Sequence, residues 1–211
     1  EYDDYLQYLI DIGASKNCEV TVVTNLTNIN KQFYKRLEQF KLIKLGVSID
    51  SYGLANNFIR YPSKFDFILR NMFWIKDTPF QVAVSVAFQV TSMFNVDTFL
   101  SWLYDMQHLY KLAGKTLDIQ LQLVRSPSAL HIQHAPLKLK QQCIEHIQQY
   151  HKGNKRLNSA AVLEIRLLHI LKELQKPHIT SQPFVDYVNK IANTRGLSLQ
   201  DYLEDWELIQ D

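Results

Sequence analysis

The chain has 211 residues, of which 46% are hydrophobic and 12% aromatic, so it can bury one globular core. Its 23 basic and 21 acidic side chains nearly balance, and no stretch clusters the cations that a nucleic-acid partner requires, so we predict no nucleic-acid binding. The apolar stretches fall short of the roughly 20 residues that span a bilayer, and we expect neither a membrane span nor a signal peptide.

The first part of the chain alternates between helical and strand patterns. Apolar residues at helical spacing predict a first helix that runs to about Ile12, where Gly13 ends it. The predicted elements that follow are a strand at 18–23, a helix at 30–40, a strand at 42–50, a helix at 65–75, a strand at 80–89, a helix at 96–113 and a strand at 117–124. The short β-branched strand at 18–23 is of the kind buried on both faces. About four strands joined by helices predict an α/β fold with parallel βαβ units.

The second part of the chain has only helical patterns. They cover 136–150, 160–176, 183–193 and 198–209, and the polar segment 152–159 is predicted to be a linker. We therefore divide the chain into residues 1–135, which hold the sheet, and a helical extension at 136–211. Two apolar stripes, one from Ile165 to Leu174 and one from Phe184 to Ile191, could dock a partner but are more often core.

The two cysteines, Cys18 and Cys143, are too few for a disulfide framework. In a chain of this size they predict reduced thiols and a cytoplasmic protein. A metal site could be proposed from His131, His134, Cys143 and His146, but the spacing is looser than that of most zinc sites.

Polar residues lie at or just after the end of each predicted strand, where parallel α/β folds bind their ligands. They are Thr24, Asn25 and Thr27, then Ser48 and Asp50, then Gln89, and finally Arg125. Asn25 and Asp50 could instead cap helices or shape turns, which is the commoner role of such residues.

Ser48 and Asp50 lie two residues apart in a predicted strand, so their side chains should share a face. Polar groups that point into a core are costly unless something polar binds them. Arg60, ten residues later, could clamp a carboxylate through its planar fork, although a solvated surface position is equally open.

Three segments in this order carry a family resemblance: Thr-Asn-Leu-Thr at 24–27, Val-Ser-Ile-Asp at 47–50 and Ile-Arg-Tyr-Pro-Ser-Lys-Phe at 59–65. Together they resemble the third and fourth strands of radical S-adenosylmethionine (SAM) enzymes, in particular the twitch-domain branch. The segments at 9–17, 125–136 and 193–197 are also similar to that branch. No single motif is specific, but their order and spacing are.

The resemblance implies a partial (β/α) TIM-like barrel of radical SAM type, followed by a small helical C-terminal region. It also implies SAM and a four-iron four-sulfur (4Fe-4S) cluster as cofactors, reductive cleavage of SAM, and hydrogen abstraction from a substrate such as a peptide or a small molecule. By position, the SAM-binding residues would be Thr24, Asn25, Ser48, Asp50, Arg60 and Gln89. Ser48 and Arg60 would hold the methionine carboxylate or the ribose, and Asp50 would shape the loop.

The sequence departs from the family in the motifs that hold the cluster. It contains neither a Cys-x-x-x-Cys-x-x-Cys loop nor a Gly-Gly-Glu-Pro segment. We therefore interpret the chain as the C-terminal portion of a radical SAM enzyme, inactive alone, whose cluster-binding half lies upstream. A sheet without its first strands would expose an edge, so we expect self-association. The alternative is a non-catalytic α/β module that binds a protein or peptide.

Overall fold

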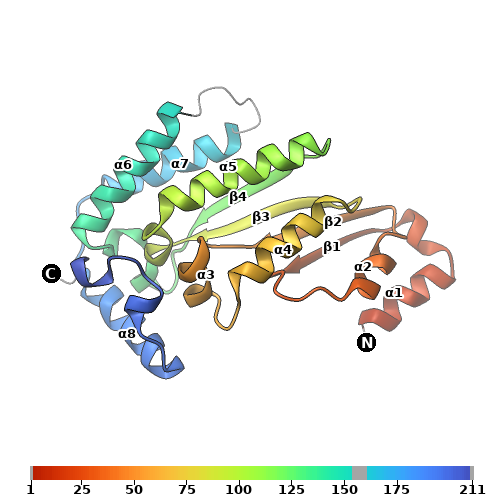
Figure 1. Cartoon of the computed structure of the whole chain (residues 1–211), viewed down its shortest axis with the longest axis horizontal. Coiled ribbons are helices and arrows are strands. Elements are labelled where there is room, and N and C mark those ends of the chain that lie inside the picture. Colours follow the sequence, from red (N-terminus) through yellow and green to blue (C-terminus); the bar gives the residue numbers. More distant parts are fainter. Residues whose placement is uncertain (1, 154–160, 210–211) are drawn as a thin grey trace.

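The computed structural model describes residues 2–153 and 161–209 and has an α/β fold built on a single parallel sheet (Figure 1). The sheet has four strands in the order β1-β2-β3-β4. The strands are β1 (Glu19–Thr24), β2 (Leu42–Ser48), β3 (Gln81–Phe88) and β4 (Leu117–Leu123). The prediction of four parallel strands is confirmed, and each strand pairs with its neighbour in the chain.

Helices connect the strands. They are α1 (Tyr2–Asp11) before β1, α2 (Lys31–Leu37) between β1 and β2, α3 (Gly53–Ile59) and α4 (Phe65–Lys76) between β2 and β3, and α5 (Val96–Leu112) between β3 and β4. The sequence predicted all of these except α3. This helix has only seven residues, and it begins at Gly53, whose positive φ of 58° marks a turn.

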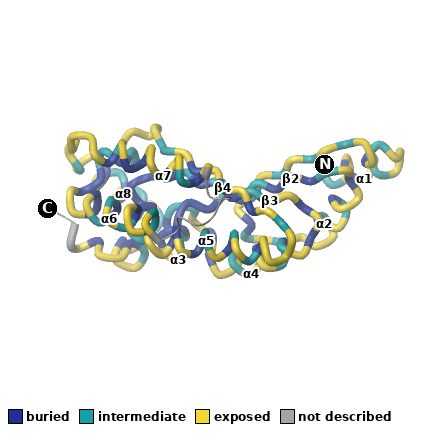
Figure 2. The backbone as a smooth tube through the Cα atoms, turned by 90° about the horizontal axis from the view of Figure 1, so that it is seen from above, coloured by how far each residue is buried: buried dark blue, intermediate teal, exposed yellow. Residues whose placement is uncertain are grey.

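Helices α3, α4 and α5 cover one face of the sheet, as Figure 2 shows. Along β3 the side chains of Val82, Val84, Val86 and Phe88 are buried, while the residues between them are less buried or exposed. Strand β1 alternates in the same way, and Val23 is 72% exposed. The prediction that residues 18–23 are buried on both faces is therefore wrong, because only one face of the sheet carries these helices.

Aromatic side chains join the sheet-side helices to the loop after β2. The Phe65 ring lies 4.8 Å from that of Tyr52 and 5.4 Å from that of Trp102. Edge-on contacts of this kind add to the free energy gained by burying the rings. The cluster fixes the start of α4 and thereby the segment between α3 and α4, which carries Arg60.

Three further helices lie at the β4 end of the sheet (Figure 1). They are α6 (Leu137–Gly153), α7 (Ala161–Leu174) and α8 (Gln182–Arg195). The fourth predicted helix, at 198–209, is wrong, since that segment forms only the short 3₁₀ helices η6 (Leu199–Asp201) and η7 (Trp206–Ile209). Asp205 interrupts it with a φ of 60°, which an α-helix does not allow. Of the predicted linker, residues 154–159 lie outside the described part of the chain.

Only part of the apolar stripe predicted on α7 is buried. Ile165 and Leu168 are 65% and 56% exposed, whereas Leu167 and Ile170 on the adjacent face are fully buried. On α8 the predicted stripe is confirmed for Phe184 and Val188, which are also fully buried. The buried residues of α6, α7 and α8 join the same hydrophobic cluster as those of the sheet, and the division at residues 135 and 136 stays a prediction.

Helix α8 is tied to α3 by one arginine. The Nη1 atom of Arg195 donates to the carbonyl oxygen of Phe58 at 2.6 Å, across 137 positions of sequence. The same guanidinium group lies over the rings of Phe58 and Tyr61, at 5.8 and 5.2 Å. The C-terminal helix therefore helps to hold the segment that precedes α4.

Within residues 2–153 and 161–209, every helix is too short or too polar to cross a bilayer. Both cysteines are free thiols. The cytoplasmic location stays a prediction.

Two buried tyrosines and one partly buried tyrosine should make the fold sensitive to alkali. Burial raises the pKa of Tyr34, Tyr110 and Tyr150 above the ordinary value of 10.0, to about 12 for Tyr150. The folded protein therefore keeps phenolic protons that the unfolded chain releases, and the stability they contribute is present below pH 10 and lost as the pH rises toward 12.

An alkaline titration followed by phenolate absorbance and circular dichroism measures this effect. We expect part of the phenolate absorbance to appear only as the circular dichroism signal of the folded chain is lost. Ionisation of all 11 tyrosines with an unchanged circular dichroism spectrum would contradict it.

Candidate functional site

The face of the sheet opposite α4 and α5 is open and polar. Its polar side chains are Thr21, Lys44, Gln81, Ser85, Asp118, Gln120 and Gln122, and the exposed Val23 lies beside them. A cavity of about 340 Å³ lies over the middle of this face, and one of about 220 Å³ lies toward the carboxyl ends of the strands. Parallel sheets are normally covered on both faces by apolar contacts. An uncovered polar face is therefore the first candidate for a ligand site.

The smaller cavity joins one cation to several neutral polar groups. Arg60 lines it together with Ser85, Gln120 and Gln122. Ser48 stands directly opposite Ser85 in the register of β2 and β3, and both side chains are half-buried. None of the described residues that line this cavity is a carboxylate, so its chemistry suits an anionic or strongly polar ligand group.

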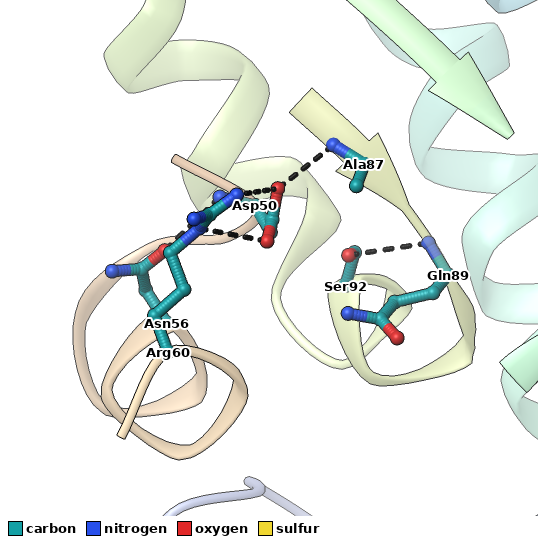
Figure 3. Close-up of polar contacts among 6 residues, drawn as sticks. All are labelled: Asp50, Asn56, Arg60, Ala87, Gln89 and Ser92. Atoms are coloured by element: carbon teal, nitrogen blue, oxygen red, sulfur yellow. Dashed lines mark hydrogen bonds and ion pairs between the residues drawn. The ribbon is translucent and has the colours of Figure 1, made fainter. Parts of the chain in front are cut away.

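Arg60 is held in place by Asp50, as Figure 3 shows. Its Nε atom lies 2.8 Å from Asp50 Oδ2, and its Nη2 atom donates to Oδ1 at 3.1 Å. The Asp50 side chain is 5% exposed and that of Arg60 is 26% exposed. This side-on pairing uses one edge of the guanidinium group, and the Nη1 atom has no partner among the described residues.

Backbone groups fix Asp50 in turn. Its Oδ1 atom accepts a hydrogen bond from the Ala87 amide of β3 at 2.8 Å, and its own amide donates to Asn56 Oδ1 at 3.0 Å. Asn56 is fully buried on α3. The neighbouring Asn57 accepts from the Phe65 amide at 2.7 Å and so caps α4. Helix α3, which the sequence did not predict, thus positions the ion pair.

Thr24 and Asn25 shape the turn after β1. The Thr24 hydroxyl accepts from the Leu26 amide at 2.9 Å, and Asn25 Oδ1 accepts from the Thr27 amide at 3.2 Å. Both side chains therefore stabilise the turn, which is the alternative to ligand binding given above for residues such as Asn25. Their contact with a ligand stays a prediction.

A larger cavity lies beside the same loop. Its volume is about 550 Å³, and Phe67, Arg70 and Trp74 of α4 form one side of it. None of the six predicted SAM-binding residues lines it. Its position therefore does not support the residue assignment that the resemblance implies.

Gln89 caps a short helix. It is 5% exposed, and its backbone carbonyl accepts from the amide of Ser92 in η2 (Val90–Met93) at 2.9 Å. The Gln89 amide in turn donates to the Ser92 hydroxyl at 3.3 Å (Figure 3). Both bonds use the backbone of Gln89 and fix the start of η2. The contact of Gln89 with SAM or substrate also stays a prediction.

The histidine and cysteine residues do not form a metal site. No group of three potential ligands comes together within the described part of the chain. Cys143 is fully buried in α6, and burial raises the pKa of its thiol well above the ordinary range. The Nδ1 atom of His146 instead lies 4.0 Å from the Oδ1 atom of Asp97 in α5.

The sequence analysis missed three polar residues of the site, namely Ser85, Gln120 and Gln122. The two glutamines could have been found from the strict alternation Leu-Asp-Ile-Gln-Leu-Gln-Leu of β4, with a polar side chain at every second position, whereas Ser85 belongs to β3. Such alternation is typical of a strand with one solvated face.

We compared the chain with models of protein families, with curated proteins and with solved structures. None of the three comparisons gives a match. The functional interpretation therefore depends on the geometry described above and on the resemblance of the sequence segments.

Proposed function

We propose that this chain is the C-terminal portion of a radical SAM enzyme and forms the part of a partial (β/α) barrel that binds SAM. The chain's own task is to bind the methionine carboxylate and orient the cofactor. The carbon–hydrogen bond to be broken belongs to a substrate that approaches the open face of the sheet.

The arrangement of the sheet supports this proposal. Strands in sequential order with their connecting helices on one face are the pattern of a (β/α) barrel, in which the opposite face lines the interior. Barrel enzymes place their sites at the carboxyl ends of the strands. Arg60 and the cavity of about 220 Å³ lie at that end of the sheet.

The observation that carries the proposal is the orientation of Arg60. Asp50 holds one edge of its guanidinium group, and the side chain borders the polar cavity. An arginine fixed on one side presents its remaining N–H donors in a planar arrangement that matches a carboxylate. SAM carries such a carboxylate on its methionine part. Asp50 is a positioning residue here, since it acts through Arg60.

The residues of this chain fit SAM but not the cluster. No set of three potential ligands occurs among the described residues, and neither cysteine belongs to a ligand motif. We therefore assign no step of the reaction to a cluster held by these residues. In the proposed enzyme the cluster ligands come from outside the 211 residues.

The missing cluster ligands also favour a second function, that of a non-catalytic α/β module. In that case the open sheet face would bind a peptide or another ligand without radical chemistry. The two functions differ in whether SAM itself binds beside Arg60.

A titration of the chain with SAM, followed by amide chemical shifts, tests the proposal. We expect shifts at Ser48, Arg60 and Ser85, and about tenfold weaker binding in Arg60→Lys. Lysine keeps the charge but loses the planar fork, so it cannot make the paired bonds to a carboxylate.

Arg70→Lys is the matched control, because Arg70 is an exposed arginine that borders a different cavity. SAM binding should be unchanged in this variant. Shifts confined to other regions, or equal losses in Arg60→Lys and Arg70→Lys, would contradict the proposal and favour the non-catalytic module.

A further inference from the structure

Basic side chains gather beyond the carboxyl end of β4. A cavity of about 390 Å³ is bordered there by Arg125, His131, His134, Lys176 and one carboxylate, Glu173. A second cavity of about 190 Å³ shares Leu123 and Arg125 with the first and adds Arg166 and His169. We call the two together the β4 basic groove.

The single carboxylate of the groove is already neutralised. Lys176 Nζ lies 2.6 and 2.8 Å from the two carboxylate oxygens of Glu173, and His169 Nε2 lies 3.8 Å from Oε1. The hydrogen bond from Lys176, and the charges around the group, hold the pKa of Glu173 below its ordinary value. Glu173 therefore leaves the other cations of the groove without a counter-charge.

The two arginines of the groove are Arg125 and Arg166. Neither Arg125 nor Arg166 forms a hydrogen bond or an ion pair with any described residue. Lys140 lines neither cavity; it is 5% exposed, and its Nζ atom donates to the backbone carbonyl of Lys176 at 3.2 Å. The groove thus presents two guanidinium groups that no described residue pairs.

The two histidines are oriented by the backbone. His131 Nδ1 accepts from the Gln133 amide at 3.3 Å, so a neutral His131 carries its proton on Nε2. Burial is the main cause that lowers the pKa of His131. The charge of the nearby Glu173 raises this pKa, whereas His134, Arg125 and Lys176 lower it further. His134 Nδ1 donates to the carbonyl oxygen of Thr180 at 2.8 Å. Neutral His131 can therefore serve as a hydrogen-bond donor rather than as a cation.

We propose that the β4 basic groove binds the phosphate group of a phosphorylated small molecule. Two unpaired guanidinium groups can together bind several oxygens of a doubly charged phosphate. A single carboxylate would occupy only one of them. Gln122 borders both this groove and the cavity of Arg60, so the two sites are neighbours at the same end of the sheet. A molecule anchored by its phosphate would extend toward the open sheet face.

Calorimetry with pyrophosphate as the probe, at constant ionic strength set by sodium chloride, tests the proposal. We expect saturable binding to the wild-type chain and about tenfold weaker binding in Arg125→Gln, since a bond to a charged group is lost. Glu173→Gln should have the opposite effect and tighten binding about threefold, because it releases Lys176 from its ion pair and makes that charge available to the anion. A purely structural role of Glu173 would not produce this gain.

Arg70→Gln is the matched control, since it makes the same change in net charge far from the groove in sequence and should bind pyrophosphate as the wild type does. Absence of binding, or equal losses in Arg125→Gln and Arg70→Gln, would overturn the proposal. Tighter binding of a single-stranded oligonucleotide than of pyrophosphate would overturn the assignment to a small molecule. SAM binding is expected to be unaffected by Arg125→Gln, so this proposal and the proposed function can fail separately.

Discussion

Replacing Asp50 by alanine should lower the free energy of unfolding by about 3 kcal/mol. The substitution leaves Arg60 with a charge that is largely removed from water and no longer paired, and it takes the acceptor from the Ala87 amide. Removing one partner of a buried ion pair lowers the free energy of unfolding more than removing both partners does. Urea denaturation followed by circular dichroism measures the change.

Asp118→Ala provides the control for that measurement. Asp118 is an exposed carboxylate on the open face of the same sheet, and its loss should change stability by less than about 0.5 kcal/mol. The double variant Asp50→Ala with Arg60→Met should recover much of the stability, because no uncompensated charge remains. If Asp50→Ala is no less stable than Asp118→Ala, the ion pair does not hold the site in the way that we infer.

Replacing Phe184 by alanine should destabilise the protein by about 4 kcal/mol. The ring is fully buried, and it lies 6.0 Å from the ring of Trp206 in an edge-on arrangement. Trp206 in turn lies 6.1 Å from Phe94, which follows η2, so Phe184 links α8 to the body of the protein. Truncation leaves a cavity that the rigid neighbours cannot fill.

Thermal unfolding together with amide hydrogen exchange measures this loss and locates it. Exchange should accelerate first in α8 and η6, and the strands should be affected less. Phe73→Ala is the control, since the Phe73 side chain is 49% exposed and its loss should cost less than about 1 kcal/mol. Equal destabilisation by both variants would show that the C-terminal segment is not anchored through Phe184.

The strands were predictable because their composition and their separation by helices both favour parallel pairing. What the sequence did not reveal was the exposure of one face, since the apolar and β-branched residues of β1 suit a covered strand as well as an open one. Val23, at 72% exposure, is apolar without being buried. Burial depends on which helices lie over a face, and that is a property of the whole sheet rather than of a strand.

The candidate site was predicted in part. The sequence selected both Asp50 and Arg60 as site residues, but it assigned the carboxylate of a ligand to Arg60, whereas the structure pairs Arg60 with Asp50. The bond from Asp50 to the Ala87 amide joins residues 37 positions apart, and no local pattern announces such a contact. Gln120 and Gln122, by contrast, were visible in the alternation of β4 and were overlooked.

The sequential order of the strands has a consequence for how the protein is made. Each strand pairs with the strand just before it in the chain, so the sheet can grow one βα unit at a time as the polypeptide leaves the ribosome. The exception is the contact from Arg195 to Phe58, which spans 137 residues and can form only after α8 has been synthesised. The segment that carries Arg60 is therefore expected to reach its final rigidity last, after the rest of the sheet is already in place.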